Sequence, residues 1–139
     1  MEIASIITAY SAAPQKDLAE LWRRIVFNMA VSNTDDHLRN HGFILVKDGW
    51  SLSPLYDVNP NIYGDTLSLN VDSNSNLIDF NLVLSVAKMY GLSQTQALED
   101  LKEIKNVVEN NWRKLAQQYG ISRGEIEGMA PAFDMRYKE

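Results

Sequence analysis

Apolar residues recur at spacings of three and four along two long stretches of this chain. This periodicity predicts two amphipathic helices, one from Asp17 to about Ser32 and one through residues 98–115. The apolar positions are Leu18, Leu21, Trp22, Ile25, Val26 and Met29 in the first stretch and Leu98, Leu101, Ile104, Val108, Trp112 and Leu115 in the second. We expect Trp22, Ile25, Leu101, Ile104, Val108 and Trp112 to share one core. The chain is therefore predicted to be mainly α.

Shorter elements are expected between and beside these helices. The apolar run Phe43–Val46, the turn residues Asp48-Gly49 and the return through residues 50–53 predict a β-hairpin whose first strand is buried. The remaining expected elements are a short helix in residues 1–10, a strand near Thr66–Val71, a helix from Asp79 or Phe80 to Tyr90, a helix start at Ser93, and a last helix that begins at Ser122 with Glu125 in a capping box. The Glu and Lys residues in 99–114 are expected to form a solvated helix face.

Length and composition set limits on the class of protein. The 139 residues suit one domain, here residues 1–139, and 45% apolar with 22% charged residues is an ordinary globular balance. A net charge of -5 argues against direct DNA binding, and the absence of cysteine excludes a disulfide framework and a thiolate zinc site. No apolar run approaches the roughly 18 to 20 residues of a membrane span. We therefore expect a cytoplasmic, bacterial-type protein.

The polar loop after the first long helix carries the chemistry. Asp35 and Asn40 are five residues apart, as are the catalytic Asp and the metal-binding Asn of protein kinases (D-x-x-x-x-N). Asp57 follows the hairpin, seventeen residues after Asn40. Because the two arms of a hairpin run antiparallel, we expect Asp57 to return beside Asn40. Asp35 would then meet a substrate hydroxyl, while Asn40 and Asp57 would bind Mg²⁺.

Neighbouring residues leave alternatives open. Asn33, Asp36, His37 and Arg39 are assigned to supporting roles, and His37 is expected to orient the loop through hydrogen bonds, as is His41. An Asn-Thr-Asp-Asp sequence also forms Asx turns or helix caps without any catalytic role. Asp36 competes with Asp35 as the residue that faces the hydroxyl, although the kinase spacing favours Asp35. Arg39 either contacts phosphate or clamps a carboxylate.

Three segments resemble the C-terminal region of HipA-like serine/threonine kinases, the toxins of bacterial toxin–antitoxin pairs. They are Leu-Trp-Arg-Arg-Ile-Val-Phe-Asn at 21–28, Asn-Thr-Asp-Asp-His-Leu-Arg-Asn-His-Gly-Phe at 33–43 and Leu-Ser-Pro-Leu-Tyr-Asp-Val-Asn-Pro at 52–60. Stretches 112–113, 116–120 and 126–129 are similar to the closing helices of the family. The resemblance covers nearly the whole chain. It implies a protein-kinase-like helical C-lobe with a small β-hairpin.

The resemblance also implies an activity and partners. The family residues that match Asp35, Asn40 and Asp57 are the catalytic base and two Mg²⁺ ligands. Such kinases transfer the γ-phosphate of ATP to a protein serine or threonine, with translation components among the reported targets. Their partner is a HipB-like helix-turn-helix antitoxin that binds operator DNA. No membrane association is expected.

The N-terminal ATP-binding lobe of these kinases has no counterpart here. The sequence contains no Gly-rich loop after a strand and no Lys in a Val-Ala-Ile-Lys-like strand. We therefore expect a lobe of a longer protein, or a truncated relative, that binds ATP poorly by itself. The alternative function is a non-catalytic fragment that binds an antitoxin or acts as a regulatory module. A plain helical scaffold with an Asx-rich turn is a further alternative.

Overall fold

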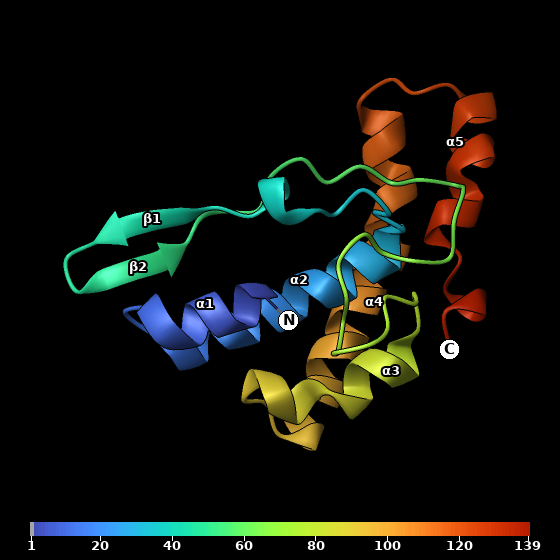
Figure 1. Cartoon of the computed structure of the whole chain (residues 1–139). Helices are drawn as coiled ribbons and strands as arrows, with labels where there is room; N and C mark the ends of the chain where they lie inside the picture. The colour runs from blue at the N-terminus through green and yellow to red at the C-terminus, as the bar shows by residue number, and fades with distance from the viewer. Residues whose placement is uncertain (1) are drawn as a thin grey trace.

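The computed structural model describes residues 2–139, and most of them lie in helices around a single core (Figure 1). The elements are α1 (Glu2–Tyr10), α2 (Pro14–Val31), η1 (Leu38–Asn40), β1 (Phe43–Val46), β2 (Gly49–Leu52), α3 (Phe80–Ser85), η2 (Ala87–Tyr90), α4 (Gln94–Gln118), α5 (Arg123–Met129), η3 (Ala130–Phe133) and η4 (Met135–Tyr137), where η denotes a 3₁₀ helix. This confirms the prediction of a mainly α fold with a small β-hairpin.

Helix α2 is the centre of the fold and packs against both α1 and α4. Trp22 of α2 is completely buried, and its indole Nε1 donates a hydrogen bond to the Val83 carbonyl of α3 at 3.0 Å. Ile25, Leu101 and Ile104 are buried in the same core, as is Val108. The predicted meeting of the two long apolar faces is therefore confirmed for these residues.

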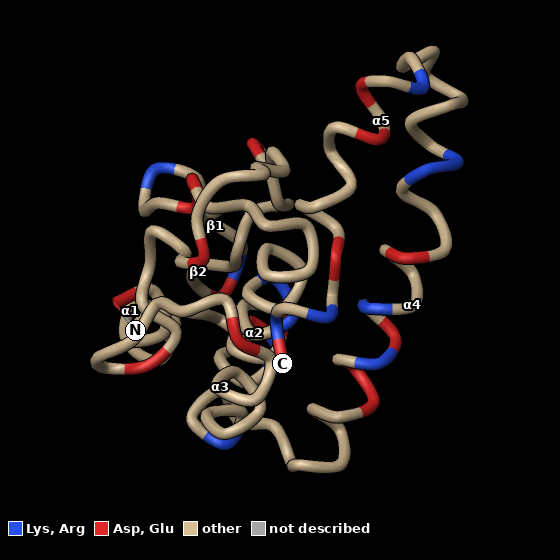
Figure 2. The backbone as a smooth tube through the Cα atoms, turned by 90° about the vertical axis from the view of Figure 1, so that its right-hand side faces the viewer, with Lys and Arg blue, Asp and Glu red and all other residues tan. Residues whose placement is uncertain are grey.

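The ends of α4 differ from the prediction. Leu98 and Leu115 are 41% and 49% exposed, and the buried residues of α4 all lie between Ala97 and Val108. Trp112 is half-buried rather than part of the main core, and its ring stacks on Phe133 with centroids 4.2 Å apart. Acidic and basic residues alternate along α4 (Figure 2), and those in 99–114 are mostly exposed, as expected of a solvated face.

The hairpin has the predicted strands but not the predicted burial. Phe43 pairs with Leu52 and Val46 with Gly49, so residues 47–48 form the turn. Figure 1 shows the hairpin extending away from the other helices beside α1, where the Trp50 carbonyl accepts a hydrogen bond from Ala12 N at 2.8 Å. The expectation of a buried first strand was wrong. A two-stranded sheet has few neighbours to cover it, and Leu45 is 67% exposed.

The segment 66–71 is not a strand in the structure. Only an isolated bridge joins Thr66 to Leu77, and the rest of the segment is irregular. The Asp72 carboxylate accepts hydrogen bonds from the backbone amides of Asn74 and Ser75, both at 2.6 Å. These local bonds form a tight turn that competes with a regular β-ladder.

The two helix starts predicted from capping residues, at Ser93 and Ser122, are present in the structure. Ser122 and Glu125 form the predicted capping box at the start of α5. Ser93 Oγ accepts a hydrogen bond from Gln96 N at the start of α4. The predicted helix that ends at Tyr90 is divided at Val86 into α3 and η2 and stops at left-handed Gly91. No helix within residues 2–139 combines the length and the apolar character needed to cross a membrane.

Candidate active site

The polar loop starts from a firmly held helix end. Ser32 follows α2 in the left-handed conformation (φ 55°), and its backbone N–H caps the Asn28 and Met29 carbonyls. Asn33 is buried, and its backbone N–H and its Nδ2 donate to the backbone O and the Oδ1 of Asn28 at 2.8 and 3.1 Å. Asn33 therefore anchors the loop to α2, while its Oδ1 is buried without a hydrogen-bond partner among residues 2–139.

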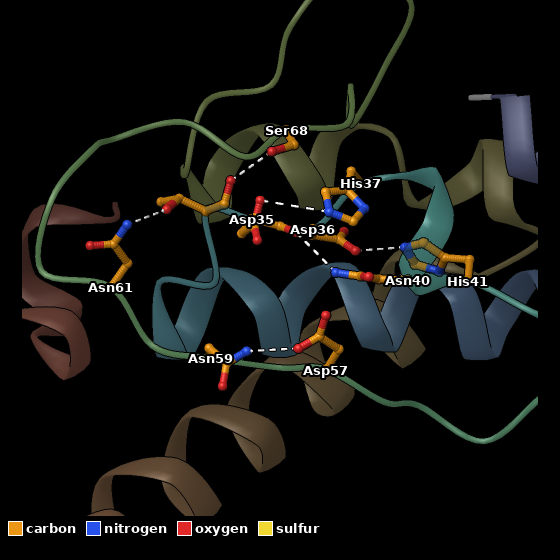
Figure 3. A network of polar contacts seen from close by, with 10 residues as sticks. Asp35, Asp36, His37, Asn40, His41, Asp57, Asn59, Asn61 and Ser68 are labelled. Atoms are coloured by element: carbon orange, nitrogen blue, oxygen red, sulfur yellow. Dashed lines mark hydrogen bonds and ion pairs between the residues drawn. The ribbon is translucent and has the colours of Figure 1, made fainter.

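The structure separates the two neighbouring carboxylates. The Asp35 side chain is 77% exposed, and its Oδ1 lies 3.8 Å from His37 Nε2. The Asp36 side chain is only 4% exposed and lies 2.6 Å from His41 Nε2 (Figure 3). Of the two histidines expected to orient the loop through hydrogen bonds, His41 is within hydrogen-bond distance of a loop carboxylate, whereas His37 is not. Asp35 is therefore the carboxylate of this pair that an external group can reach.

Asn40 is tied directly to the Asp35 backbone. Its side chain is buried at the end of η1, and Nδ2 donates to the Asp35 carbonyl at 3.0 Å. The backbone N–H of Asn40 donates to the His37 carbonyl at 2.9 Å. With Nδ2 occupied, Oδ1 is the atom of this side chain that remains to bind a cation.

The hairpin returns the chain to this loop. Ser53 N donates to the Gly42 carbonyl, and the Tyr56 hydroxyl donates to the Arg39 carbonyl, both at 2.9 Å. Asp57 follows directly, and its carboxylate points toward the side of the loop that carries the Asn40 amide (Figure 3). The structure thus brings the segment of Asp57 against the loop of Asp35 and Asn40.

Asp57 has an unusual backbone. Its φ of 54° is left-handed, and within the described chain only Ser32 shares this property among non-glycine residues. The Ser32 conformation belongs to a helix cap, whereas Asp57 ends no helix. Its Oδ1 accepts a hydrogen bond from Asn59 Nδ2 at 2.9 Å. Left-handed geometry costs energy in most residues, and such outliers concentrate at functional sites.

Two other predicted residues have few partners. Arg39 is exposed, and its guanidinium has no hydrogen bond or ion pair within residues 2–139, so the structure gives no support to the carboxylate clamp. His37 Nδ1 is buried without a partner in the same part of the chain. A cavity of about 400 Å³ lies beside Asp36, Leu38 and His41 and is not lined by Asp35, Asn40 or Asp57.

Several supporting residues were missed from the sequence. Thr34 receives hydrogen bonds from Asn61 Nδ2 (to Oγ1, 2.8 Å) and from Ser68 Oγ (to the carbonyl, 2.7 Å). Nothing in the sequence indicated the role of Tyr56, whose hydroxyl bonds to the Arg39 carbonyl. The sequence signal for Asn61 and Ser68 is the Asn- and Ser-rich composition of residues 59–76, which indicates a loop but no particular contact.

The donor set suits a hard cation only in part. No group of three or more His, Cys, Asp or Glu side chains within residues 2–139 lies where it could hold a metal ion. Asn40 and Asp57 carry side-chain oxygens of the kind that Mg²⁺ prefers, and Mg²⁺ is commonly held by one or two carboxylates together with substrate phosphates and water. The residues fit a metal that is shared with a nucleotide, not a site formed by protein alone.

The fold and the loop define a class: a mainly α domain with a two-stranded hairpin that joins a D-x-x-x-x-N loop to a further Asp. A family model described as the HipA-like C-terminal domain matches residues 1–112. The chain therefore belongs to the HipA-like C-terminal domain family, which is associated with kinases of toxin–antitoxin pairs. A search of curated proteins found no match.

Proposed function

We propose that this chain contributes the catalytic base and the Mg²⁺ ligands of a HipA-like serine/threonine protein kinase. The observation that carries the proposal is the hydrogen bond from the Tyr56 hydroxyl to the Arg39 carbonyl. It joins the segment of Asp57 to the loop of Asp35 and Asn40. Phosphoryl transfer depends mainly on positioning and charge stabilisation, for which a carboxylate and hard oxygen ligands are the required groups.

Each residue has a distinct part in the proposed reaction. ATP and Mg²⁺, when bound, supply the γ-phosphoryl group and neutralise charge on the phosphates. Asp35 accepts the hydrogen bond of a serine or threonine hydroxyl and takes its proton, while the hydroxyl oxygen bonds to phosphorus and the bond to ADP breaks. Asn40 Oδ1 and the Asp57 carboxylate would hold the cation. Arg39, whose guanidinium is exposed and has no partner among residues 2–139, would contact a phosphate.

The proposed reaction needs further components. In the HipA-like kinases that the chain resembles, a separate N-terminal lobe binds ATP, so we expect transfer only when such a lobe is present. The acceptor would be a serine or threonine of a protein, a translation component as in the family. A HipB-like helix-turn-helix antitoxin would be the regulatory partner, and the reaction would take place in the cytoplasm.

Transfer of label from γ-labelled ATP tests this proposal in a protein that joins this chain to an ATP-binding lobe. Asp35→Asn keeps the size of the side chain but removes its basicity, so transfer should fall by at least about a hundredfold. Asp48→Asn is the matched control, because Asp48 is an exposed carboxylate in the hairpin turn. Full activity of the Asp35→Asn protein would refute the base assignment.

The exposed hairpin supports a second candidate function, which is protein binding without catalysis. Ile44, Leu45 and Trp50 are each more than two-fifths exposed, which is unusual for adjoining large apolar side chains. In this case the chain would bind an antitoxin or act as a regulatory module. Leu45→Asp would then abolish binding of the antitoxin, whereas Asp35→Asn would leave the affinity for the antitoxin unchanged.

A further inference from the structure

The C-terminal end of the chain folds back onto the start of the candidate active-site loop. Lys138 Nζ donates hydrogen bonds to the Ala30 carbonyl at 2.9 Å and to the Ala132 carbonyl at 2.7 Å. Ser32 Oγ donates to the same Ala132 carbonyl at 2.7 Å. Residues 130–138 lie outside the segment that matches the family model, whereas Ala30 and Ser32 lie inside it.

Ser32 connects this contact to both halves of the site. Its carbonyl accepts hydrogen bonds from Thr34 N, at the beginning of the loop, and from Asn61 N, which follows Asp57 in the chain, both at 3.0 Å. The side chains of these two residues also bond to each other, because Asn61 Nδ2 donates to Thr34 Oγ1. The position of Ser32 therefore affects the loop of Asp35 and the segment after Asp57 together.

The surroundings of Lys138 show what holds its amino group in place. Lys138 is buried, and its backbone carbonyl is fixed by a hydrogen bond from Phe80 N. Ala30 is in the last turn of α2, where carbonyls lack helical partners and the helix dipole is negative. An ammonium group satisfies one of these carbonyls and complements the dipole. Without it, buried carbonyls would lose a partner.

We propose that Lys138 is a positioning residue that holds the left-handed turn at Ser32, and with it the loop that carries Asp35 and Asn40. Its relevance to phosphoryl transfer rests on the proposed function. Lys138 touches neither Asp35 nor Asn40. Its effect passes through the Ala132 carbonyl to Ser32 and from Ser32 to Thr34 and Asn61.

Amide hydrogen exchange of this chain tests, independently of any activity, whether Lys138 holds the turn at Ser32. Lys138→Met keeps a long apolar stem but removes the donors, and exchange of the Thr34 and Asn61 amides should become about tenfold faster. Amides in the middle of α4 should be unchanged. Lys105→Met is the matched control, because Lys105 contacts Glu139 and the Phe80 ring but not the loop. Unchanged exchange at Thr34 and Asn61, or equal acceleration everywhere, would overturn the proposal.

Kinetics in the protein with an ATP-binding lobe test the link to catalysis. Lys138→Met should lower kcat about tenfold with little change in the KM for ATP, and Lys138→Arg, which retains a cationic donor, should recover part of the loss. Equal kcat values for Lys138→Met and the wild type would refute the positioning role. Failure of Asp35→Asn to reduce transfer would instead refute the proposed function. The hydrogen-exchange result would still decide whether Lys138 holds the turn at Ser32.

Discussion

His41 Nε2 lies 2.6 Å from Asp36 Oδ1, and both side chains are almost completely buried beneath the candidate active-site loop. A buried carboxylate or imidazole that loses its partner remains desolvated without compensation. Asp36→Ala should therefore lower the free energy of unfolding by about 3 kcal/mol. Asp35→Ala, the matched change at the exposed neighbour, should stay within about 0.5 kcal/mol. Urea titrations of both variants measure this difference, and equal losses would contradict the assigned burial.

Asp57→Asn is expected to change the metal dependence of transfer rather than stability. Asparagine tolerates the left-handed backbone at this position (φ 54°), so the turn should persist. The lost charge should weaken Mg²⁺ binding and lower transfer by at least about a hundredfold at limiting Mg²⁺. A Mg²⁺ titration of the rate in the protein with an ATP-binding lobe measures this effect. An unchanged titration curve would remove Asp57 from the proposed metal ligands.

The apolar residues of α4 should contribute unequally to the free energy of unfolding. Leu101 and Ile104 are buried between α2 and α4, so replacing either by Ala should cost roughly 2 to 5 kcal/mol. Leu98→Ala is the matched control on the same helix and should cost less than about 1 kcal/mol, because Leu98 is exposed. Thermal or urea unfolding measures all three. A neutral Leu101→Ala would contradict the packing of α4.

Two buried groups should make stability depend on alkaline pH in opposite directions. Burial lowers the pKa of Lys138 from 10.5 to about 8, so between these values the unfolded chain holds a proton that the folded chain has lost. Its contribution to the unfolding free energy therefore rises with pH across this window. Burial raises the pKa of Tyr90 from 10.0 to about 12, so the folded chain keeps the proton longer and stability falls with pH between these values.

Urea unfolding at a series of alkaline pH values separates the two effects. Lys138→Met should remove the rise that begins near pH 8, and Tyr90→Phe should reduce the fall above pH 10. The Tyr90→Phe variant also loses the hydrogen bond from its hydroxyl to the Val71 carbonyl. Only the change of slope with pH is therefore diagnostic. Identical slopes in the wild type and Lys138→Met would contradict the buried state of Lys138.

ATP should bind weakly or not at all to the 139-residue chain alone. The cavity beside the loop is not lined by Asp35, Asn40 or Asp57, whereas nucleotide sites normally enclose most of their ligand. Isothermal titration calorimetry with ATP and Mg²⁺ measures this. Tight binding by this chain would refute the requirement for a separate ATP-binding lobe.

Local signals in the sequence were enough to predict the helices, the hairpin and the capping box of Ser122 and Glu125. A helix face or a cap depends on residues three or four positions apart, so nearby sequence contains most of the information. The kinase-like spacing of Asp35 and Asn40 was visible for the same reason. The family resemblance that it supported agrees with the family match over residues 1–112.

Contacts between distant parts of the chain decided the rest. Which of Asp35 and Asp36 faces outward depends on His41, and the support of the loop depends on Asn61 and on Lys138, which bonds to a carbonyl 108 positions earlier in the chain. The buried first strand and the strand at 66–71 were predicted wrongly for the same reason. Strand formers favour an extended chain, but a regular strand needs a bonding partner, and burial needs a covering surface. The arrangement of α1 and α2 leaves the first hairpin strand without a covering surface. The turn at residues 72–75 leaves the segment 66–71 without a regular strand partner.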